Sequence, residues 1–336
     1  MKTMNTLRRS ISTGFCAVAA TLCLGVSGAA MAQAQTVYPQ GGRVTVVVPF
    51  APGGATDIIG RMIADELGKR WNTTVVVDNK AGASGGIGTE FVARSKADGY
   101  TLLLGTQTAL AVNPSLIKKL PYNVEKDFSP ITYLASTPLV LLASRKSGAA
   151  DANALFALLR TKPDAISYGT SGNGTSQHLT TLLLLNRIGA KAVHIPYKGS
   201  SQSLTDLAGN QIDMQFDNMT TALAFAKNGQ ARALAVTSLS RTPLQPDLPT
   251  VAELGLAGFE AVTWLGLLAP AGTPTDVVNF LNREVTAVLD SASVKSRLAA
   301  QGFTPRPMQP DAFTKFIKEE TAKFADLIKI NNIVID

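Results

Sequence analysis

The chain has 336 residues and a formal net charge of +7 at pH 7, and aromatic residues make up only 6% of it. Lysine and arginine form no nucleic-acid-type cluster, and few aromatic side chains could stack on bases, so we expect no nucleic-acid partner. With two histidines and two cysteines in the whole chain, the composition also argues against a transition-metal site.

The first 32 residues have the pattern of a secretory signal peptide. A short apolar run follows three basic residues and ends at residues 30–32 (AMA), where the two alanines are the small residues of a cleavage site. This pattern predicts cleavage near Ala32, whereas a membrane anchor would need a longer and less interrupted apolar run. Cleavage leaves 304 residues with 28 basic and 24 acidic side chains, a net charge of +4. Cleavage also removes both Cys16 and Cys23, and a mature chain without cysteine suits an oxidising compartment.

After the predicted cleavage site, short β-rich runs alternate with helical patterns. The first series has strands at 43–48, 74–78 and 101–105 and helices at 56–70 and 87–96. The second has strands at 139–144, 166–170, 192–197, 212–217 and 232–238, with helices at 152–161 and from 175. Helices at 275–290, 292–300 and 310–330 complete the chain. Such alternation predicts an α/β protein with mostly parallel sheets flanked by helices.

The length and the restart of the strand series predict two lobes rather than one core. We expect residues 33–137 and 260–336 to form the first lobe and residues 138–259 to form the second. Two chain crossings would then act as the hinge.

Glycine-rich loops follow several of the predicted strands. They lie at 52–57 (PGGATD), 79–86 (NKAGASGG), 105–108 (GTQT) and 169–178 (GTSGNGTSQH). In open α/β sheets, ligands bind beyond the carboxyl ends of the strands. Helix N-termini there present backbone N–H groups and partial positive charge, so they can hold a carboxylate without a lysine. The sequence therefore predicts an anion-binding cleft between the lobes.

The residues predicted to bind the ligand lie in these loops and at the ends of later strands. They are Pro49, Phe50, Gly53, Gly54, Thr56, Asp57, Ala83, Ser84, Thr106, Gln107, Ser171, Gly172, Gly174, Thr175, Ser176, His178, Tyr197, Lys198, Phe216 and Asp217. Several have structural alternatives. Asp57 is as well suited to holding its own loop as to touching the ligand, the hydroxyl residues could be helix caps, and His178 could simply be packed. Lys198 has the alternative of a solvated charge, and Phe216 and Asp217 that of a structural turn.

Several motifs, in this order along the chain, resemble the tripartite tricarboxylate transporter receptors, the Bug-type periplasmic binding proteins. They are PFAPGGATD, VDNKAGASGGIGTEFVARSKADGYTLLLGT, YGTSGNGTSQHL and HIPYKGSSQSLTDLAGNQIDMQFDN, followed by RALAVTSLSR, LPTVAELG and LLAPAGTP. The resemblance implies a two-lobed Venus-flytrap protein that closes on a small carboxylate, holds it by backbone amides and hydroxyls, and delivers it to a large and a small membrane subunit. The chain departs from the family pattern at Ala81, where proline is usual, and at Ser84, which adds a hydroxyl.

A secreted serine hydrolase is the main alternative, because residues 82–86 (GASGG) match the G-x-S-x-G elbow. The preceding strand is predicted to end near Asp78, too early for an elbow at Ser84. Both His178 and His194 lie mid-chain, whereas that fold places its histidine late. We therefore expect no catalytic residue, no metal and no cofactor.

A binding protein that serves a sensor instead of a transporter has the same sequence features and stays open. The expected ligand is a dicarboxylate, a tricarboxylate, an amino acid or an aromatic acid, and the expected state is a monomer.

Overall fold

The structure is a computed structural model that describes residues 38–39, 42–162 and 165–330. The chain divides into two units, residues 1–40 and 41–336, and the description below concerns the second. The predicted signal peptide, with Cys16 and Cys23, lies outside the described residues.

The first strand set is parallel, as the sequence pattern predicts. Its order is β2-β1-β3, formed by Val75–Asn79, Val44–Val48 and Thr101–Thr106. Helix α2 (Ala55–Trp71) connects β1 to β2, and a short turn η1 (Ala83–Gly85) and helix α3 (Gly86–Ala93) connect β2 to β3. β-branched residues fit the pleated surface of a buried strand, and four of the five residues of β1 are buried valines.

Two antiparallel strands carry the chain between the strand sets. β4 (Phe128–Ala143) leads from the first set to the second, and β9 (Val262–Pro270) leads back. β4 pairs with β9 along residues 128–138 and with later strands along residues 139–143. The sheet is therefore mixed, with antiparallel strands at its centre, because these two strands run in opposite directions.

The second strand set contains β5 (Ser167–Thr170), β6 (Val193–Pro196), β7 (Met214–Asn218) and β8 (Arg232–Val236). β5 is parallel to β6 and β7, whereas β7 and β8 are antiparallel to β4. The helices of this set are α6 (Ala152–Thr161), α7 (Ser176–Ile188), α8 (Ser200–Ala208) and α9 (Met219–Lys227). Alternate residues of β4 serve opposite faces: Leu139 and Leu141 join the core under α6 and α7, and Val140 and Leu142 join the core under α8 and α9.

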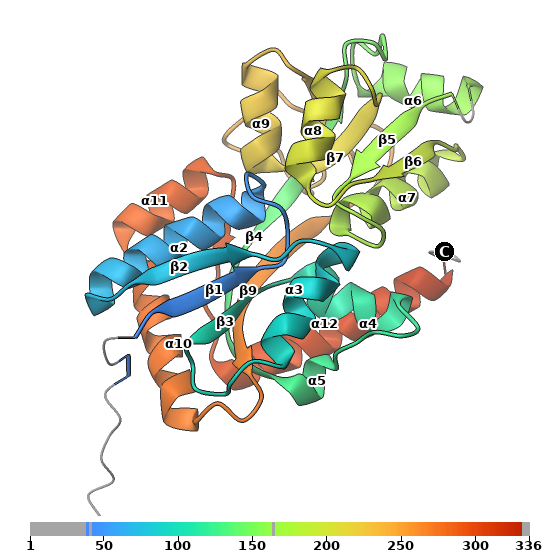
Figure 1. Ribbon diagram of the computed structural model, residues 1–336. Coiled ribbons are helices and arrows are strands. Elements are labelled where there is room, and N and C mark those ends of the chain that lie inside the picture. Colours follow the sequence, from blue (N-terminus) through green and yellow to red (C-terminus); the bar gives the residue numbers. More distant parts are fainter. Residues whose placement is uncertain (1–37, 40–41, 163–164, 331–336) are drawn as a thin grey trace, which may run out of the picture. The chain divides into compact units, whose positions relative to one another are not determined.

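The C-terminal helices return to the first strand set. They are α10 (Thr275–Asp290), α11 (Ala292–Ala300) and α12 (Pro310–Ile330), and the short strand β10 (Thr304–Pro305) pairs with β4. α12 packs Phe313 edge-on against Trp264 and Tyr133, beside the short segments η2 (Thr108–Val112) and α4 (Asn113–Leu116). One further helical turn, α5 (Val124–Asp127), precedes β4 (Figure 1).

The hydrogen-bonded ladder passes from the first strand set to the second through β4 and β9 without a break. The two-lobed α/β fold is confirmed by the comparisons reported below. The lobe boundaries at residues 137/138 and 259/260 stay a prediction.

Candidate ligand-binding site

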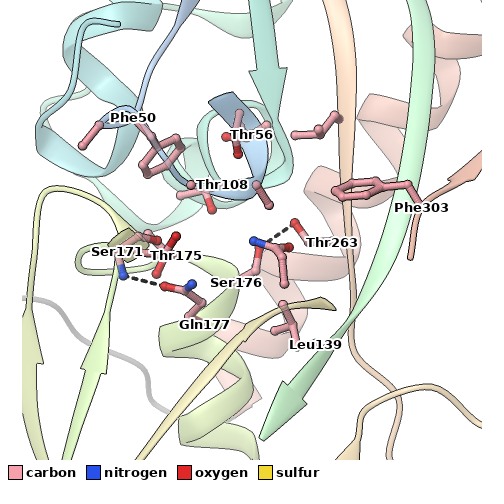
Figure 2. A pocket seen from close by; sticks show the side chains of 17 residues that line it. Phe50, Thr56, Thr108, Leu139, Ser171, Thr175, Ser176, Gln177, Thr263 and Phe303 are labelled. Carbon is pink, nitrogen blue, oxygen red and sulfur yellow. Dashed lines mark hydrogen bonds between the residues drawn. The ribbon is translucent and has the colours of Figure 1, made fainter. Parts of the chain in front are cut away.

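A cavity of about 50 Å³ lies between the loops that follow the strands of the two sets. Figure 2 shows Phe50, Thr56 and Thr108 on one side of it and Ser171, Thr175 and Gln177 on the other. Its lining is Phe50, Ala51, Gly54, Ala55, Thr56, Thr106, Thr108, Leu139, Ser171, Thr175, Ser176, Gln177, Ser200, Asn218, Thr263, Leu265 and Phe303. All of these side chains are uncharged, and eight of them carry a hydroxyl group.

Four helices begin at this cavity. The N-caps of α2, α7 and α9 are the lining residues Gly54, Thr175 and Asn218, and the first residue of α8 is the lining residue Ser200. The first N–H groups of a helix have no partner within the helix, and they carry the positive end of its dipole. The cavity is therefore electropositive without any cationic side chain.

Asp57 holds the first glycine loop in place. Its Oδ2 accepts the Gly53 N–H at 3.0 Å, and its Oδ1 accepts the Asn79 amide at 2.9 Å. Arg61 donates to it as well, with Nε 3.0 Å from Oδ2. Asn79 in turn donates to the Phe50 carbonyl at 3.0 Å. Burial acts to raise the pKa of Asp57, but these hydrogen bonds outweigh it and lower the pKa.

Polar side chains of α7 hold the glycine loop of the second strand set. Thr175 caps the helix by accepting the His178 N–H, and its hydroxyl donates to the Gly172 carbonyl at 2.8 Å. His178 Nδ1 accepts the Gly174 N–H at 2.9 Å, and Gln177 Oε1 accepts the Ser171 N–H at 2.5 Å. Thr175, His178 and Gln177 thus hold this loop at Gly172, Gly174 and Ser171 respectively.

The chain's two histidines stack beside this loop. The rings of His178 and His194 lie 4.1 Å apart at 9°, and the ring of Tyr168 stacks against that of His194 at 4.8 Å. His194 Nε2 lies 2.7 Å from the hydroxyl of Thr170. Burial, with repulsion from His194, lowers the pKa of His178 to about 3, and burial lowers that of His194 to about 4. Both rings are therefore neutral at pH 7.

Asp217 is a carboxyl group buried directly behind the cavity lining. It is 0% exposed, and its Oδ1 accepts the Gln177 amide at 2.7 Å and the Asn218 N–H at 2.8 Å. Its Oδ2 accepts the hydroxyl of Thr221 at 3.0 Å. Burial raises the pKa of Asp217 to about 7, and these three hydrogen bonds only partly oppose it.

Three serines join the two strand sets around the cavity. The hydroxyl of Ser84 donates to the Asn173 carbonyl, and that of Ser201 donates to the Pro52 carbonyl at 3.0 Å. Ser176 bonds to Gln107 Oε1 at 2.9 Å and to Thr263 Oγ1 at 3.1 Å. The structure is consequently closed around the site.

The structure brings seven of the predicted site residues to the cavity wall: Phe50, Gly54, Thr56, Thr106, Ser171, Thr175 and Ser176. The others stand outside the lining: Pro49, Gly53, Asp57, Ala83, Ser84, Gln107, Gly172, Gly174, His178, Tyr197, Lys198, Phe216 and Asp217. Most of these lie close behind it. Tyr197 instead donates to Asp206 at 2.6 Å, Phe216 is buried in the core under α6 and α7, and Lys198 is exposed.

Sequence reasoning missed ten residues that line the cavity: Ala51, Ala55, Thr108, Leu139, Gln177, Ser200, Asn218, Thr263, Leu265 and Phe303. Gln177 lies within a predicted loop and could have been included. Ser200 and Asn218 begin helices that the strand series did not predict. Phe303 and Thr263 are distant in sequence from every glycine loop, so no local signal points to them.

The hydrolase alternative finds no support in the geometry. β2 ends at Asn79, and Ser84 has φ 52° within a three-residue turn rather than at a strand-to-helix elbow. Its hydroxyl is occupied by the Asn173 carbonyl. Both histidine rings bond to residues 170–174 rather than to Ser84.

Within the described ranges, no helix is both long and apolar enough to cross a membrane. Among these same residues, no group of three or more histidine, cysteine and acidic side chains could hold a metal ion.

Residues 59–333 match the tripartite tricarboxylate transporter family receptor. The chain is 38% identical over 307 residues to protein BugT of Bordetella pertussis, covering 91% of this chain and 94% of that protein. Among solved structures, the periplasmic binding protein BugD is 35% identical with a TM-score of 0.84, covering 87% of this chain and 98% of that one.

Two other solved relatives contain a bound acid. An R. palustris protein solved with adipate is 34% identical with a TM-score of 0.85, covering 88% of this chain and 99% of that one. MatC from Rhodopseudomonas palustris, with bound malate, is 32% identical with a TM-score of 0.80, covering 85% of this chain and 99% of that one. The matched family is one of receptors and BugD is a periplasmic binding protein, which supports a non-enzyme reading of this chain. The chain belongs to the tripartite tricarboxylate transporter family receptors.

Proposed function

We propose that this protein captures a small organic carboxylate in the periplasm and delivers it to a tripartite tricarboxylate-type membrane transporter. The observation that carries the proposal is the start of four helices at one cavity whose lining is uncharged. Bound adipate and malate in two relatives support the same ligand class.

The first turns of these helices supply the donors. Within the described part of the chain, the backbone N–H groups of Ala55, Thr56, Ser176, Gln177 and Ser200 have no acceptor. Hydrogen bonds from N–H groups to a carboxylate are charge-assisted and therefore strong. Side-chain hydroxyls complete the donor set, and Phe50, Leu139, Leu265 and Phe303 supply apolar surface.

A thermal-shift screen of organic acids tests the ligand class, because a ligand at 100 times its Kd stabilises the folded protein by about 2.7 kcal/mol. We expect short dicarboxylates, beginning with malate and adipate, to raise the melting temperature. Loss of uptake of the same acid in a strain that lacks the receptor gene, with its membrane subunits intact, would support delivery to the transporter. Normal uptake in that strain would contradict delivery.

Gly54→Val tests the helix-terminus mechanism. A Cβ at Gly54 would lie 3.0 Å from the hydroxyl of Ser200, so a larger side chain would intrude on the donors. We expect binding to weaken by at least about 2 kcal/mol, the scale of losing charge-assisted bonds. Folding should change less, because Gly54 has φ −81°, which valine can adopt.

Lys198→Ala is the matched control, because Lys198 is exposed and stands outside the cavity lining. Calorimetry should show nearly unchanged binding. If Gly54→Val binds normally while Lys198→Ala loses the ligand, recognition depends on a side-chain cation and the proposed mechanism is wrong.

A further inference from the structure

We propose that capture of the carboxylate is coupled to uptake of one proton by Asp217, which makes this residue a proton site linked to the ligand site. This inference rests on the proposed function and extends it by naming a second bound species. The proton comes from solvent when the acid is captured and returns to solvent when the acid is released.

The first support is the position of Asp217. Its carboxyl group touches two residues of the cavity lining, the Gln177 side chain and the Asn218 backbone. Gln177 also accepts the Ser171 N–H, so one side chain links the carboxyl group to the glycine loop. A negative charge in the cavity would therefore lie one side chain away from Asp217, in a buried region where charges are weakly screened.

The second support is that the charge of Asp217 has no compensation. Within the described residues, no cation pairs with it, in contrast to Asp57, which pairs with Arg61. An isolated buried carboxylate is unfavourable, so such groups take up a proton more readily than exposed ones. The pKa of about 7 that burial gives this group leaves it partly protonated at neutral pH.

The surroundings of Asp217 can also accommodate the proton. Oδ2 faces the hydroxyl of Thr221, which lies 3.2 Å from the Asn218 carbonyl as a second acceptor. When Oδ2 is protonated, it can donate to Thr221, and Thr221 can donate to Asn218. Oδ1 keeps its bonds from Gln177 and Asn218, so the Asp217 carboxyl group has hydrogen-bond partners in both protonation states.

No other ionisable group explains such coupling. β4 contributes only apolar residues opposite Asp217. The other elements around β7 carry ionisable groups, but none of these groups hydrogen-bonds to Asp217. They are His178 and Arg187 on α7, Tyr168 on β5, His194 on β6, Asp206 on α8 and Lys227 on α9. Both histidines are already neutral at pH 7, since burial lowers the pKa of each to about 3 and 4.

The sign of the effect follows from linkage. A bound carboxylate disfavours the ionised form of Asp217 and raises its pKa further, so binding takes up a proton wherever the free protein is ionised. Uptake should therefore be partial near pH 7 and rise towards one proton per ligand at higher pH. Affinity should be constant well below pH 7 and fall by up to about tenfold per pH unit above it.

Calorimetry with malate or adipate, in buffers of different ionisation enthalpy between pH 6 and 8.5, measures the proton uptake directly. We expect uptake that rises through pH 7 in the wild-type protein and is absent in Asp217→Asn, an isostere of the protonated form. The variant should bind with an affinity that does not change over this range. Asp213→Asn is the control, because Asp213 precedes the same strand but bonds to Ser167, away from the cavity.

Infrared titration of the ligand-free protein gives a readout that does not depend on the acid. A protonated-carboxyl band that persists at pH 6 and is missing from Asp217→Asn would support the proposal, as would its increase when ligand is added at pH 8. If Asp217→Asn fails to fold, the wild-type uptake and band still decide the matter. Ligand binding without proton uptake, or Asp217 ionised at pH 5, would overturn this inference and leave the proposed function intact. Absence of binding by every acid would instead overturn the proposed function.

Discussion

At the residue scale, the site depends on buried carboxyl groups that do not face the ligand. Asp57 is 4% exposed and stabilises the first glycine loop through its backbone, whereas Asp217 lies behind the lining of the second. Their electrostatic settings are opposite. Arg61 compensates Asp57 and keeps it ionised, but Asp217 has only neutral donors. A bound carboxylate can thus lie near Asp57 while Asp57 is ionised, because Arg61 balances its charge. Near Asp217 it is favourable only when Asp217 is protonated.

Asp57→Ala should destabilise the protein and weaken binding together. The change removes acceptors for the Gly53 N–H, Arg61 and Asn79, and we expect it to cost about 2 kcal/mol of unfolding free energy. Urea denaturation and calorimetry measure the two effects. Asp65→Ala is the control on the same helix: Asp65 forms an exposed ion pair with Lys69, so its loss should change little. A stable Asp57→Ala that binds normally would show that the loop needs no such support.

At the element scale, the position of the helix N-termini determines what the cavity can bind. α2 and α7 follow glycine loops that the sequence identifies, and both were predicted from β1 and β5 followed by helical patterns. α8 and α9 also begin at the cavity, but they are nine residues each and start at Ser200 and Met219 without a preceding glycine cluster of the same kind. The N-termini of α8 and α9 reach the cavity because of the tertiary fold, and no local sequence pattern predicts that position.

Strands, like helices, can be predicted from the sequence only where the local pattern is clear. The valines of β1 and the leucines at residues 139–142 indicate buried strands on their own. The first half of β4 was missed, because Ser129, Pro130, Ser136 and Pro138 interrupt its apolar pattern. Proline removes a ladder donor and is a poor predictor of a central strand. Register shifts between Pro130 and Thr132 and between Tyr133 and Ala135 accompany the interruption.

Two N-cap variants separate helix stability from ligand binding. Thr175→Ala on α7 and Asp151→Ala on α6 each remove a side-chain cap, from the N–H groups of His178 and Ala154 respectively. Each should cost about 1 kcal/mol of unfolding free energy. Only Thr175 lines the cavity and also holds the Gly172 carbonyl, so only Thr175→Ala should weaken binding in calorimetry. Equal losses of affinity in both variants would indicate a general effect of stability on binding.

At the scale of the whole molecule, the closed form is held by hydrogen bonds outside the cavity. Ser84 lies in the turn η1 of the first strand set, and Ser201 lies in the first turn of α8 in the second. Each donates to a backbone carbonyl of the other set, at Asn173 and Pro52 respectively. Neither serine lines the cavity. A contact made only when the protein is closed favours the closed state by its own free energy, whatever the ligand is.

Ser84→Ala combined with Ser201→Ala should therefore weaken binding without touching the ligand. Two hydrogen bonds of about 1 kcal/mol each would lower the affinity by up to about thirtyfold, because binding must then supply the free energy that closure loses. Small-angle scattering of the ligand-free variant should show a larger radius of gyration than the wild type if these bonds hold the free protein closed. Ser95→Ala with Ser238→Ala is the matched control, since both hydroxyls donate to carbonyls of their own segments, at Phe91 and Ser240. Unchanged affinity and scattering in the Ser84 and Ser201 variant would mean that these contacts follow closure and do not determine it.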